Sequence, residues 1–327
     1  MRGMRVLITG GAGYIGSHVV LDALNSGCEV TIFDNLSTSN RVNINPNAKF
    51  IKGDISSNKD LLRLFKNNNF EAVIHLAGLK CARESMIYPQ KYALNNIIGS
   101  LNLLNKCVDY HIKYFIFSSS AAVYGNPEYI PVDELHPLNP INYYGFSKLS
   151  FENNLKWISS SNGISYASLR YFNAAGYDSQ KRIFGSEIYA QNLIPIVMET
   201  ALGKRPFVSI FGSNYMTKDG TGIRDYIHVN DLAEAHIKSL KYISEKNKNL
   251  IINLGSEKGY SVIDIIKTAR KITENDIQYK IENPRPGEVA ELVASCSIAK
   301  SLIGWEQIDS NLEKIIKSTW AVYQKQG

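Results

Sequence analysis

The sequence predicts an α/β protein built on a doubly wound parallel sheet, and three patterns in its first half support this. Short apolar segments with strand character recur along the first 172 residues. Segments with helical spacing lie between several of them, and a glycine-rich turn follows the first one. Strands that alternate with helices in this way form parallel sheets that are covered on both faces.

Taken in order, the expected strands are short and rich in branched or aromatic residues, as buried parallel strands are. They lie at residues 5–9, 29–34, 49–55, 72–78, 114–120 and 164–172. Apolar residues at helical spacing follow the first strand at 17–27 and precede the fifth at 95–111. A further helix begins near residue 142. These elements make up a first domain, residues 1–172.

Beyond residue 172 the regular alternation stops. Residues 173–187 have the composition of a loop, and residues 212–229 are rich in turn residues. Helices are expected at 192–204 and at 230–243, the second capped by Asn230 or Asp231, and a strand is expected at 249–256. The sequence therefore predicts a smaller mixed α/β domain, residues 173–327, with segments that pack back on the first.

Composition excludes several classes of protein. The chain has 327 residues, is 44% hydrophobic and carries a net charge of +6, but its Lys and Arg residues are scattered, so no nucleic-acid partner is expected. No apolar stretch approaches the roughly 18 residues of a membrane span, and the run at 6–8 is too short for a signal peptide. The four cysteines are widely separated, which predicts reduced thiols, a cytoplasmic protein and no metal site.

The turn "TGGAGYIG", Thr9 to Gly16, lies between the first strand and the first helix. Glycines spaced this way allow a tight turn and a close approach of the backbone to a pyrophosphate, which the helix N-terminus then binds. Asp34 ends the second strand and can accept hydrogen bonds from both hydroxyls of an adenosine ribose. Arg41 nearby could tolerate a 2′-phosphate, but Asp34 favours NAD, so residues 1–172 are predicted to be a Rossmann domain that binds NAD.

The segment "NYYGFSK" places Tyr144 and Lys148 four residues apart, on one face of the predicted helix, while Tyr143 turns away. Ser118, Ser119 and Ser120 end the fifth strand, at the sheet edge where ligands bind in such folds. Tyr144 as phenolate could remove a hydroxyl proton from a substrate. Lys148 and the positive nicotinamide ring would lower the pKa of the Tyr144 phenol, and Ser120 would bind the reacting oxygen. A chance helical pair and serines that satisfy backbone groups are the structural alternative.

Four motifs carry a resemblance to a known family: "SSSAAVYG" at 118–125, "YGFSK" at 144–148, "RYFNAAG" at 170–176 and "DGTGIRDYIHV" at 219–229. Together they resemble the UDP-glucose 4-epimerases, a nucleotide-sugar branch of the extended short-chain dehydrogenase/reductase family, along essentially the whole chain. The resemblance implies an isomerase with resident NAD that epimerises a UDP-hexose at C4 through a 4-keto intermediate. It also implies a homodimer formed through helices of the first domain.

The resemblance, together with the glycine turn, assigns site residues. Ser120, Tyr144 and Lys148 are the expected catalytic residues, and all three would also contact the cofactor. The other expected cofactor contacts are Gly10, Gly13, Tyr14, Ile15, Gly16, Asp34, Asn35, Leu36, Ser37, Thr38, Ser39, Asp54, Ile55, Leu76, Ala77, Gly78, Leu79, Lys80, Asn95 and Phe172. The expected substrate contacts are Ser120, Tyr144, Asn173, Asn192, Leu193, Phe211, Arg224, Arg285, Glu288 and Leu292. Arginines suit a diphosphate, although surface salt bridges are the plain alternative for them.

Residues at a few single positions help to distinguish a 4-epimerase from enzymes with other activities. Nucleotide-sugar 4,6-dehydratases and decarboxylases of the family carry an acid just after the catalytic hydroxyl, where this chain has Ala121 and Ala122. An NAD site would also suit a dehydrogenase that releases NADH or a non-catalytic regulator that binds NAD. Leu292, or Glu291 or Val293 if the alignment shifts by one, stands where a tyrosine restricts the family to plain hexoses. UDP-glucose and UDP-galactose are therefore the leading substrates, and N-acetylated UDP-sugars are the alternative.

Overall fold

The computed structural model describes residues 1–39, 41–185, 191–285 and 288–326. Its centre is a seven-stranded sheet in the order β3-β2-β1-β4-β5-β6-β10, in which every pair is parallel. The strands are β1 Arg5–Thr9, β2 Glu29–Asp34, β3 Lys49–Lys52, β4 Ala72–His75, β5 Tyr114–Ser120, β6 Ser165–Tyr171 and β10 Leu250–Leu254. The strand order reverses between β1 and β4, which confirms the predicted doubly wound Rossmann sheet.

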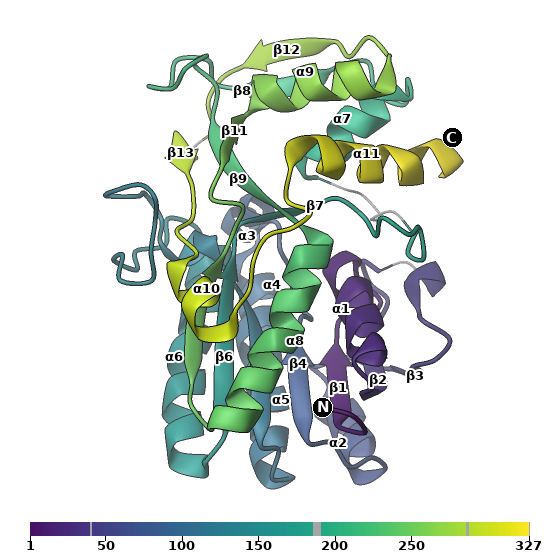
Figure 1. The fold of residues 1–327 in the computed structure, drawn as a ribbon. Helices are drawn as coiled ribbons and strands as arrows, with labels where there is room; N and C mark the ends of the chain where they lie inside the picture. The colour runs from purple at the N-terminus through teal and green to yellow at the C-terminus, as the bar shows by residue number, and fades with distance from the viewer. Residues whose placement is uncertain (40, 186–190, 286–287, 327) are drawn as a thin grey trace.

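Helices cover both faces of this sheet (Figure 1). On one face, α1 (Tyr14–Asn25) and α8 (Val229–Lys246) enclose an apolar cluster that includes Val20, Ile32 and Leu240. The helices of the opposite face are α2 Asn58–Lys66, α5 Ser100–Asp109 and α6 Tyr143–Asn162. A second cluster lies beneath them. Burial on both faces explains why the strands are almost continuously apolar in sequence.

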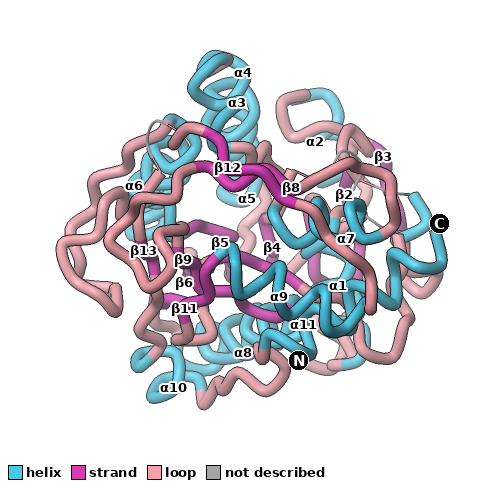
Figure 2. The backbone as a smooth tube through the Cα atoms, turned by 90° about the horizontal axis from the view of Figure 1, so that it is seen from above, coloured by secondary structure: helices cyan, strands magenta, loops and turns pink. Residues whose placement is uncertain are grey.

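A second region lies over the carboxyl ends of the central strands (Figures 1 and 2). It contains a four-stranded sheet around β9 and a parallel pair of β8 with β12. Its strands are β7 Asn173–Ala175, β8 Val208–Phe211, β9 Ile223–His228, β11 Gly259–Ser261, β12 Tyr279–Glu282 and β13 Glu291–Leu292. Its helices are α7 Leu193–Ala201, α9 Val262–Thr273 and α11 Leu312–Tyr323. A third apolar cluster joins these elements.

The remaining helices lie in two other parts of the chain. Between β4 and α5 the chain forms α3 (Ala82–Ile87), α4 (Pro89–Tyr92) and a π-helical segment, Ala93–Gly99. After β13, helix α10 (Ser297–Ile303) packs against α8 and β10. Strand β10 extends the central sheet beside β6, and α8 and α10 pack against β10, so segments after residue 172 pack on the elements before it. Within the described ranges, no helix is both long and apolar enough to span a membrane.

Two local predictions were wrong. Residues 173–187 were expected to form a loop, but Asn173–Ala175 forms strand β7, which pairs with β9. Three residues are too few to show a period, and only the tertiary pairing makes them a strand. Helix α8 is capped by His228, whose ring accepts the backbone N–H of Asn230, rather than by Asn230 or Asp231.

Candidate active site

The glycine turn forms a backbone cradle between β1 and α1. Gly10 has a φ of +73°, and a Cβ there would lie 2.6 Å from the backbone nitrogen of Ala77. A Cβ on Gly16 would collide with the carbonyl oxygen of Gly10. Helix α1 starts at Tyr14 with Gly13 as its cap, so no side chain covers the N–H groups of its first turn. This arrangement suits the pyrophosphate of a dinucleotide, which needs both close backbone approach and free N–H groups.

Asp34 faces the same turn from the end of β2. Its buried carboxylate accepts hydrogen bonds from Ala12 N (3.0 Å), Leu36 N (2.8 Å) and Ser39 Oγ (2.7 Å). A carboxylate offers about four lone-pair sites, so one site, on Oδ2, remains for a ribose hydroxyl. The negative charge of Asp34 also repels a 2′-phosphate, which is why this geometry favours NAD over its phosphorylated form.

The segment after Asp34 is tied to the end of β3. Asn35 Nδ2 donates to Asp54 Oδ2 at 2.8 Å, and Asn35 Oδ1 accepts the backbone N–H of Ser37 at 2.9 Å. Burial alone raises the pKa of Asp54, but hydrogen bonds from Ser56 and Asn35 outweigh it and leave the pKa lowered. The predicted Asp34–Ser39 segment and Asp54 therefore lie together, with Asp54 as a charged acceptor. The neighbouring Ile55 side chain is buried in the second apolar cluster.

The loop after β4, Leu76 to Lys80, is held by the π-helical segment. Asn96, which the sequence analysis did not single out, accepts the backbone N–H of Leu79 at 2.8 Å and donates to its carbonyl at 2.9 Å. The adjacent Asn95, which was predicted to contact the cofactor, has a buried Oδ1 without a hydrogen-bond partner among the described residues. Segments of π-helix often occur at functional sites. Asn96 thus holds the backbone of this loop in place.

The three predicted catalytic residues come from β5 and α6. Asn142 caps α6 by accepting the N–H of Gly145 at 2.9 Å, and Tyr144 N donates to Ser85 Oγ at 2.9 Å. Lys148 is buried, donates from Nζ to the carbonyl of Ser118 at 2.8 Å, and lies 5.8 Å from the centre of the Tyr144 ring. Ser120 ends β5 and interacts with the Tyr144 phenol. The structure thus brings these residues to one edge of the sheet.

The pKa values of this group are set mainly by burial. Burial lowers the pKa of Lys148 to about 8, although the Coulombic attraction of Glu152 raises it. Burial raises the pKa of Tyr144, and the hydrogen bond with Ser120 only partly opposes this. The lowering of the Tyr144 pKa that the sequence predicts is therefore not produced by the protein alone. It requires further positive charge beside the phenol, which fits the expected contribution of the nicotinamide ring.

Tyr143 takes the other side of α6. Its ring centre lies 5.4 Å from that of Phe146, and its backbone N donates to Met86 Sδ at 3.4 Å. Tyr14 is similarly directed away from the glycine turn: its hydroxyl donates to the Gly176 carbonyl and its ring lies 5.1 Å from that of Tyr177. The Tyr14 side chain thus contacts the segment at Gly176 and Tyr177, and the Ile15 side chain packs on the first apolar cluster.

Behind Lys148 lies a buried ion pair that the sequence analysis missed. Arg170 donates to both carboxylate oxygens of Glu152, from Nε at 3.0 Å and from Nη2 at 2.6 Å. Ser119 Oγ donates to Glu152 Oε1 at 2.5 Å. A sequence signal did exist, because Tyr144, Lys148 and Glu152 follow each other at intervals of four residues.

The expected substrate residues fall into two groups. In one, Leu292 on β13 is the register neighbour of Arg224 on β9, and Asn173 Nδ2 donates to the carbonyl of Asp225 at 3.0 Å. Arg224 Nη1 donates to the Ile223 carbonyl at 2.8 Å. Leu292, Arg224 and Asn173 all lie on strands of the four-stranded sheet, which therefore brings the residues of this group together.

In the second group, the Arg285 guanidinium lies 3.3 Å above the centre of the Phe211 ring and 3.5 Å from Glu288 Oε1. The Nε of Arg285 is buried and has no hydrogen-bond partner among the described residues. Pro286 and Gly287, between Arg285 and Glu288, lie outside the described residues.

The other predicted positions are more scattered. Asn192 is exposed at the start of α7, and Leu193 packs on the third apolar cluster. Phe172 is buried and donates its backbone N–H to the Leu254 carbonyl at 3.1 Å. Within the described part of the chain, no group of three or more His, Cys, Asp or Glu side chains could hold a metal ion.

The chain matches the model of a known protein family and is similar to several known proteins. The family model described as "NAD dependent epimerase/dehydratase family" matches residues 6–255. A UDP-glucose 4-epimerase of Bacillus subtilis is 41% identical over 327 aligned residues, which cover 97% of this chain and 96% of that protein. The structure is similar to a UDP-glucose 4-epimerase from Bifidobacterium longum in complex with NAD⁺ and UDP (TM-score 0.93, 35% identity, 99% of each chain). It is also similar to the UDP-Glc/GlcNAc 4-epimerase of Campylobacter jejuni (TM-score 0.86, 37% identity, 99% and 100% of the chains).

Proposed function

The chain belongs to the NAD-dependent epimerase/dehydratase family, and from this premise we propose that it interconverts UDP-glucose and UDP-galactose with NAD as a resident cofactor. One observation carries the proposal. Ser120, Tyr144 and Lys148 meet at the carboxyl end of β5, beside the glycine turn that suits a dinucleotide. The similarity to UDP-glucose 4-epimerases along nearly the whole chain is the reason for proposing a UDP-hexose as the substrate.

In this proposal each residue has one task. Tyr144 removes the proton of the sugar C4 hydroxyl, Ser120 holds the same oxygen by a hydrogen bond, and Lys148 stabilises the phenolate with its charge. When bound, NAD supplies the acceptor and donor of hydride for C4. Tyr144 then returns the proton after the transient 4-keto sugar has turned its other face towards the site. Because the same oxidation state is restored, no cofactor is consumed.

Turning the sugar over requires a firm hold on the nucleotide and a loose one on the hexose. We assign Arg285 and Arg224 to the diphosphate, because a guanidinium group can donate two parallel hydrogen bonds to phosphate oxygens. In the helical turn that follows Ser120, Ala121–Val123, all three side chains are apolar. Their methyl groups cannot transfer a proton at C5 or C6, which disfavours dehydratase and decarboxylase activity.

Product analysis by NMR tests the proposal. UDP-galactose and UDP-N-acetylgalactosamine are supplied to the purified protein in separate tubes, without added cofactor. Conversion of UDP-galactose to UDP-glucose is expected. Steady growth of absorbance at 340 nm with added NAD⁺ would instead indicate a dehydrogenase, and absence of turnover even with NAD⁺ would leave the NAD-binding regulator.

The second tube tests the N-acetylated substrates, and Leu292 is the observation that favours them. A leucine lies beside Arg224 where a tyrosine would fill more space. We expect Leu292→Tyr to lower any turnover of the N-acetylated sugar by roughly 10–200-fold, the range that a small change in pocket size produces, while UDP-galactose is still converted. Leu292→Met is the control of similar volume. An equal loss for both sugars in Leu292→Tyr would contradict the assignment of Leu292 to the sugar pocket.

We further propose a homodimer formed through the π-helical segment, α5 and α6. Leu94 and Ile98 are 59% and 46% exposed, and Phe146 and Trp157 on α6 are 46% and 74% exposed. Both pairs have helical spacing, and α6 packs against the π-helical segment and α5, so the side chains form apolar stripes on adjacent helices. A second copy related by a two-fold axis would bring each stripe against its equivalent.

The oligomeric state is measured by light scattering after gel filtration. The wild type is expected at twice the 36.6 kDa of the chain, and Ile98→Glu with Trp157→Glu at the mass of the monomer. Leu302→Glu, at another exposed apolar position (47% exposed) on α10, is the control that should remain dimeric. A dimeric Ile98→Glu/Trp157→Glu variant would place the interface elsewhere.

A cytoplasmic location completes the proposal. All four cysteines are free thiols, and Cys28, Cys107 and Cys296 are buried. Reduced thiols are usual for proteins of the cytoplasm.

A further inference from the structure

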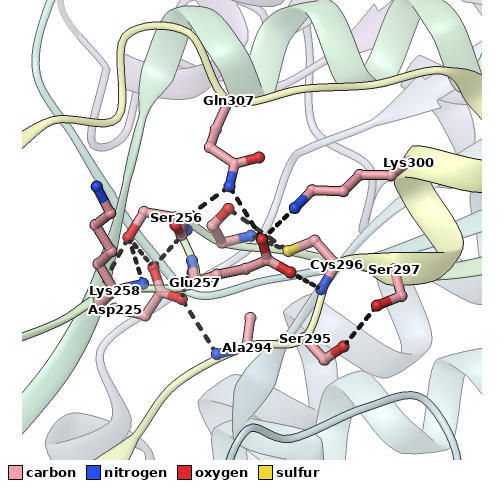
Figure 3. Close-up of polar contacts among 11 residues, drawn as sticks. Asp225, Ser256, Glu257, Lys258, Ala294, Ser295, Cys296, Ser297, Lys300 and Gln307 are labelled. Carbon is pink, nitrogen blue, oxygen red and sulfur yellow. Dashed lines mark hydrogen bonds and ion pairs between the residues drawn. The ribbon is translucent and has the colours of Figure 1, made fainter.

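Asp225 lies in β9 with a fully buried carboxylate that accepts hydrogen bonds from two other segments (Figure 3). Its Oδ1 accepts from Ser256 N at 2.6 Å and from Ser256 Oγ at 2.7 Å. Its Oδ2 accepts from Glu257 N at 3.0 Å and from Ala294 N at 3.1 Å. Burial raises the pKa of Asp225 to about 6 against the effect of these hydrogen bonds. With four donors directed at its two oxygens, the Asp225 carboxyl group acts as a hydrogen-bond acceptor in this structure.

These bonds connect three chain segments that are distant in sequence. They are β9 itself, the loop that follows β10, and the segment that follows β13. The loop approaches closely because its glycine has no side chain: a Cβ on Gly255 would lie 2.5 Å from Asp225 Oδ2. A bulkier residue at Gly255 would push the loop away from β9.

Two of these three segments, β9 and the one that follows β13, carry or adjoin a residue that we assign to the substrate. Arg224 precedes Asp225 on β9, and the Asp225 carbonyl accepts the hydrogen bond from Asn173 Nδ2. Leu292 is two residues before Ala294, whose N–H Asp225 accepts. One carboxylate thus fixes the spacing between residues assigned to the diphosphate and to the sugar.

A second carboxylate, that of Glu257, holds the same segment two residues further along, at Cys296 (Figure 3). Glu257 has a φ of +59°, and its Oε1 accepts Cys296 N at 2.9 Å. Its Oε2 pairs with Lys300 Nζ and accepts Gln307 Nε2 at 3.2 Å. The left-handed backbone of Glu257 is uncommon for a residue with a side chain, and the hydrogen bond from its N–H to Asp225 helps to hold it. The segment after β13 is therefore fixed at both Ala294 and Cys296.

We propose that Asp225 is a positioning residue for substrate binding, which sets the distance between the Arg224 side and the Leu292 side of the site. This rests on the proposed function, because that function assigns Arg224, Asn173 and Leu292 to the substrate. Asp225 does not touch the reacting atoms in this role. It acts through the backbone of the segments that carry the contacts.

The test is Asp225→Asn in the full-length protein. The amide has the shape of the carboxylate, but its NH₂ group would face the N–H groups of Glu257 and Ala294 and repel them. We expect the Kd of UDP, measured by calorimetry, and the KM of UDP-galactose to rise by about tenfold, the effect of leaving buried donors unpaired. The kcat at saturation and the NAD bound per chain should stay near wild type.

Asp231→Asn is the matched control. Asp231 is also buried and accepts the N–H groups of Ile308 and Asp309 and the Ser310 hydroxyl, but at the start of α8. It should lower the melting temperature without changing the KM. Ser256→Ala, which removes only one hydroxyl donor, replaces Asp225→Asn if that variant does not fold, and should raise the Kd of UDP in the same direction.

The possible outcomes distinguish failure of the proposed function from failure of the inference about Asp225. If wild-type protein neither binds UDP nor converts UDP-galactose, the proposed function is wrong, whatever the variants do. If wild type is active but Asp225→Asn and Asp231→Asn change the KM equally, or if Asp225→Asn lowers kcat and NAD content instead, Asp225 has a general structural role and the inference is overturned.

Discussion

Tyr144→Phe is expected to lower kcat by about 10³-fold, within the 10²–10⁴ range of general acid–base catalysis, while NAD stays bound. The phenol oxygen is the one group at the end of β5 that we assign to proton removal from the substrate, and phenylalanine leaves the ring packing intact. Burial raises the pKa of Tyr144 and Ser120 offsets this only in part, so the phenolate depends on the charge of Lys148 and of the bound cofactor. Steady-state kinetics and the absorbance of released cofactor measure both quantities.

Tyr143→Phe is the matched control, because it makes the same change one residue earlier on the same helix. The Tyr143 ring contacts Phe146 on the outer side of α6, so its loss should leave kcat within about twofold, as surface substitutions usually do. Turnover lost in Tyr143→Phe and kept in Tyr144→Phe would reverse the assignment of the base.

The parts of this site that were predictable from sequence are those formed by local patterns. The strand runs and the glycine spacing predict β1, the turn and α1, since each depends on neighbours in the chain. The interval from Tyr144 to Lys148 predicts a shared helix face for the same reason. Placing Ser120 beside them required only the rule that the carboxyl ends of parallel strands meet at one edge.

The parts that were not predictable depend on partners far away in the sequence. Strand β7 exists because Asn173–Ala175 pairs with β9, about fifty residues later. Asn96 and Asn95 are adjacent and chemically equal, and only the fold shows which one binds the backbone of Leu79 and which keeps a free acceptor. Asp225 looks like any strand carboxylate in the sequence, and its role emerges from donors at Ser256, Glu257 and Ala294.

The buried pair of Glu152 and Arg170 connects stability to catalysis. The two side chains are 5% and 4% exposed and share two hydrogen bonds. Glu152 lies one helical turn after Lys148 and raises its pKa, against the burial that lowers it to about 8. The carboxylate thus keeps a larger share of Lys148 charged at neutral pH, and a charged Lys148 is what the phenolate of Tyr144 needs.

We expect Glu152→Gln to cost about 3–5 kcal/mol of unfolding free energy, because it leaves the Arg170 guanidinium buried without its counter-ion. It should also shift the pH dependence of kcat. Lys148 is charged below its pKa and neutral above it, so activity that needs the charge is lost as pH rises through that value. Removing the Glu152 carboxylate lowers the pKa of Lys148, and the alkaline limb of the kcat profile should therefore move to lower pH.

A double variant distinguishes the two effects. In Glu152→Gln with Arg170→Met the unpaired charge is gone, so part of the lost stability should return, as when buried ion pairs are replaced together. The negative charge next to Lys148 is still missing in this variant, so the alkaline limb should stay at the lower pH of the single variant. If the single variant loses stability while its kcat profile keeps the wild-type alkaline limb, the pair supports the fold alone and does not act on Lys148. A limb that shifts in the single variant and stays shifted in the double one, while stability returns, would show that the Glu152 carboxylate sets the charge on Lys148 independently of its contribution to the stability of the fold.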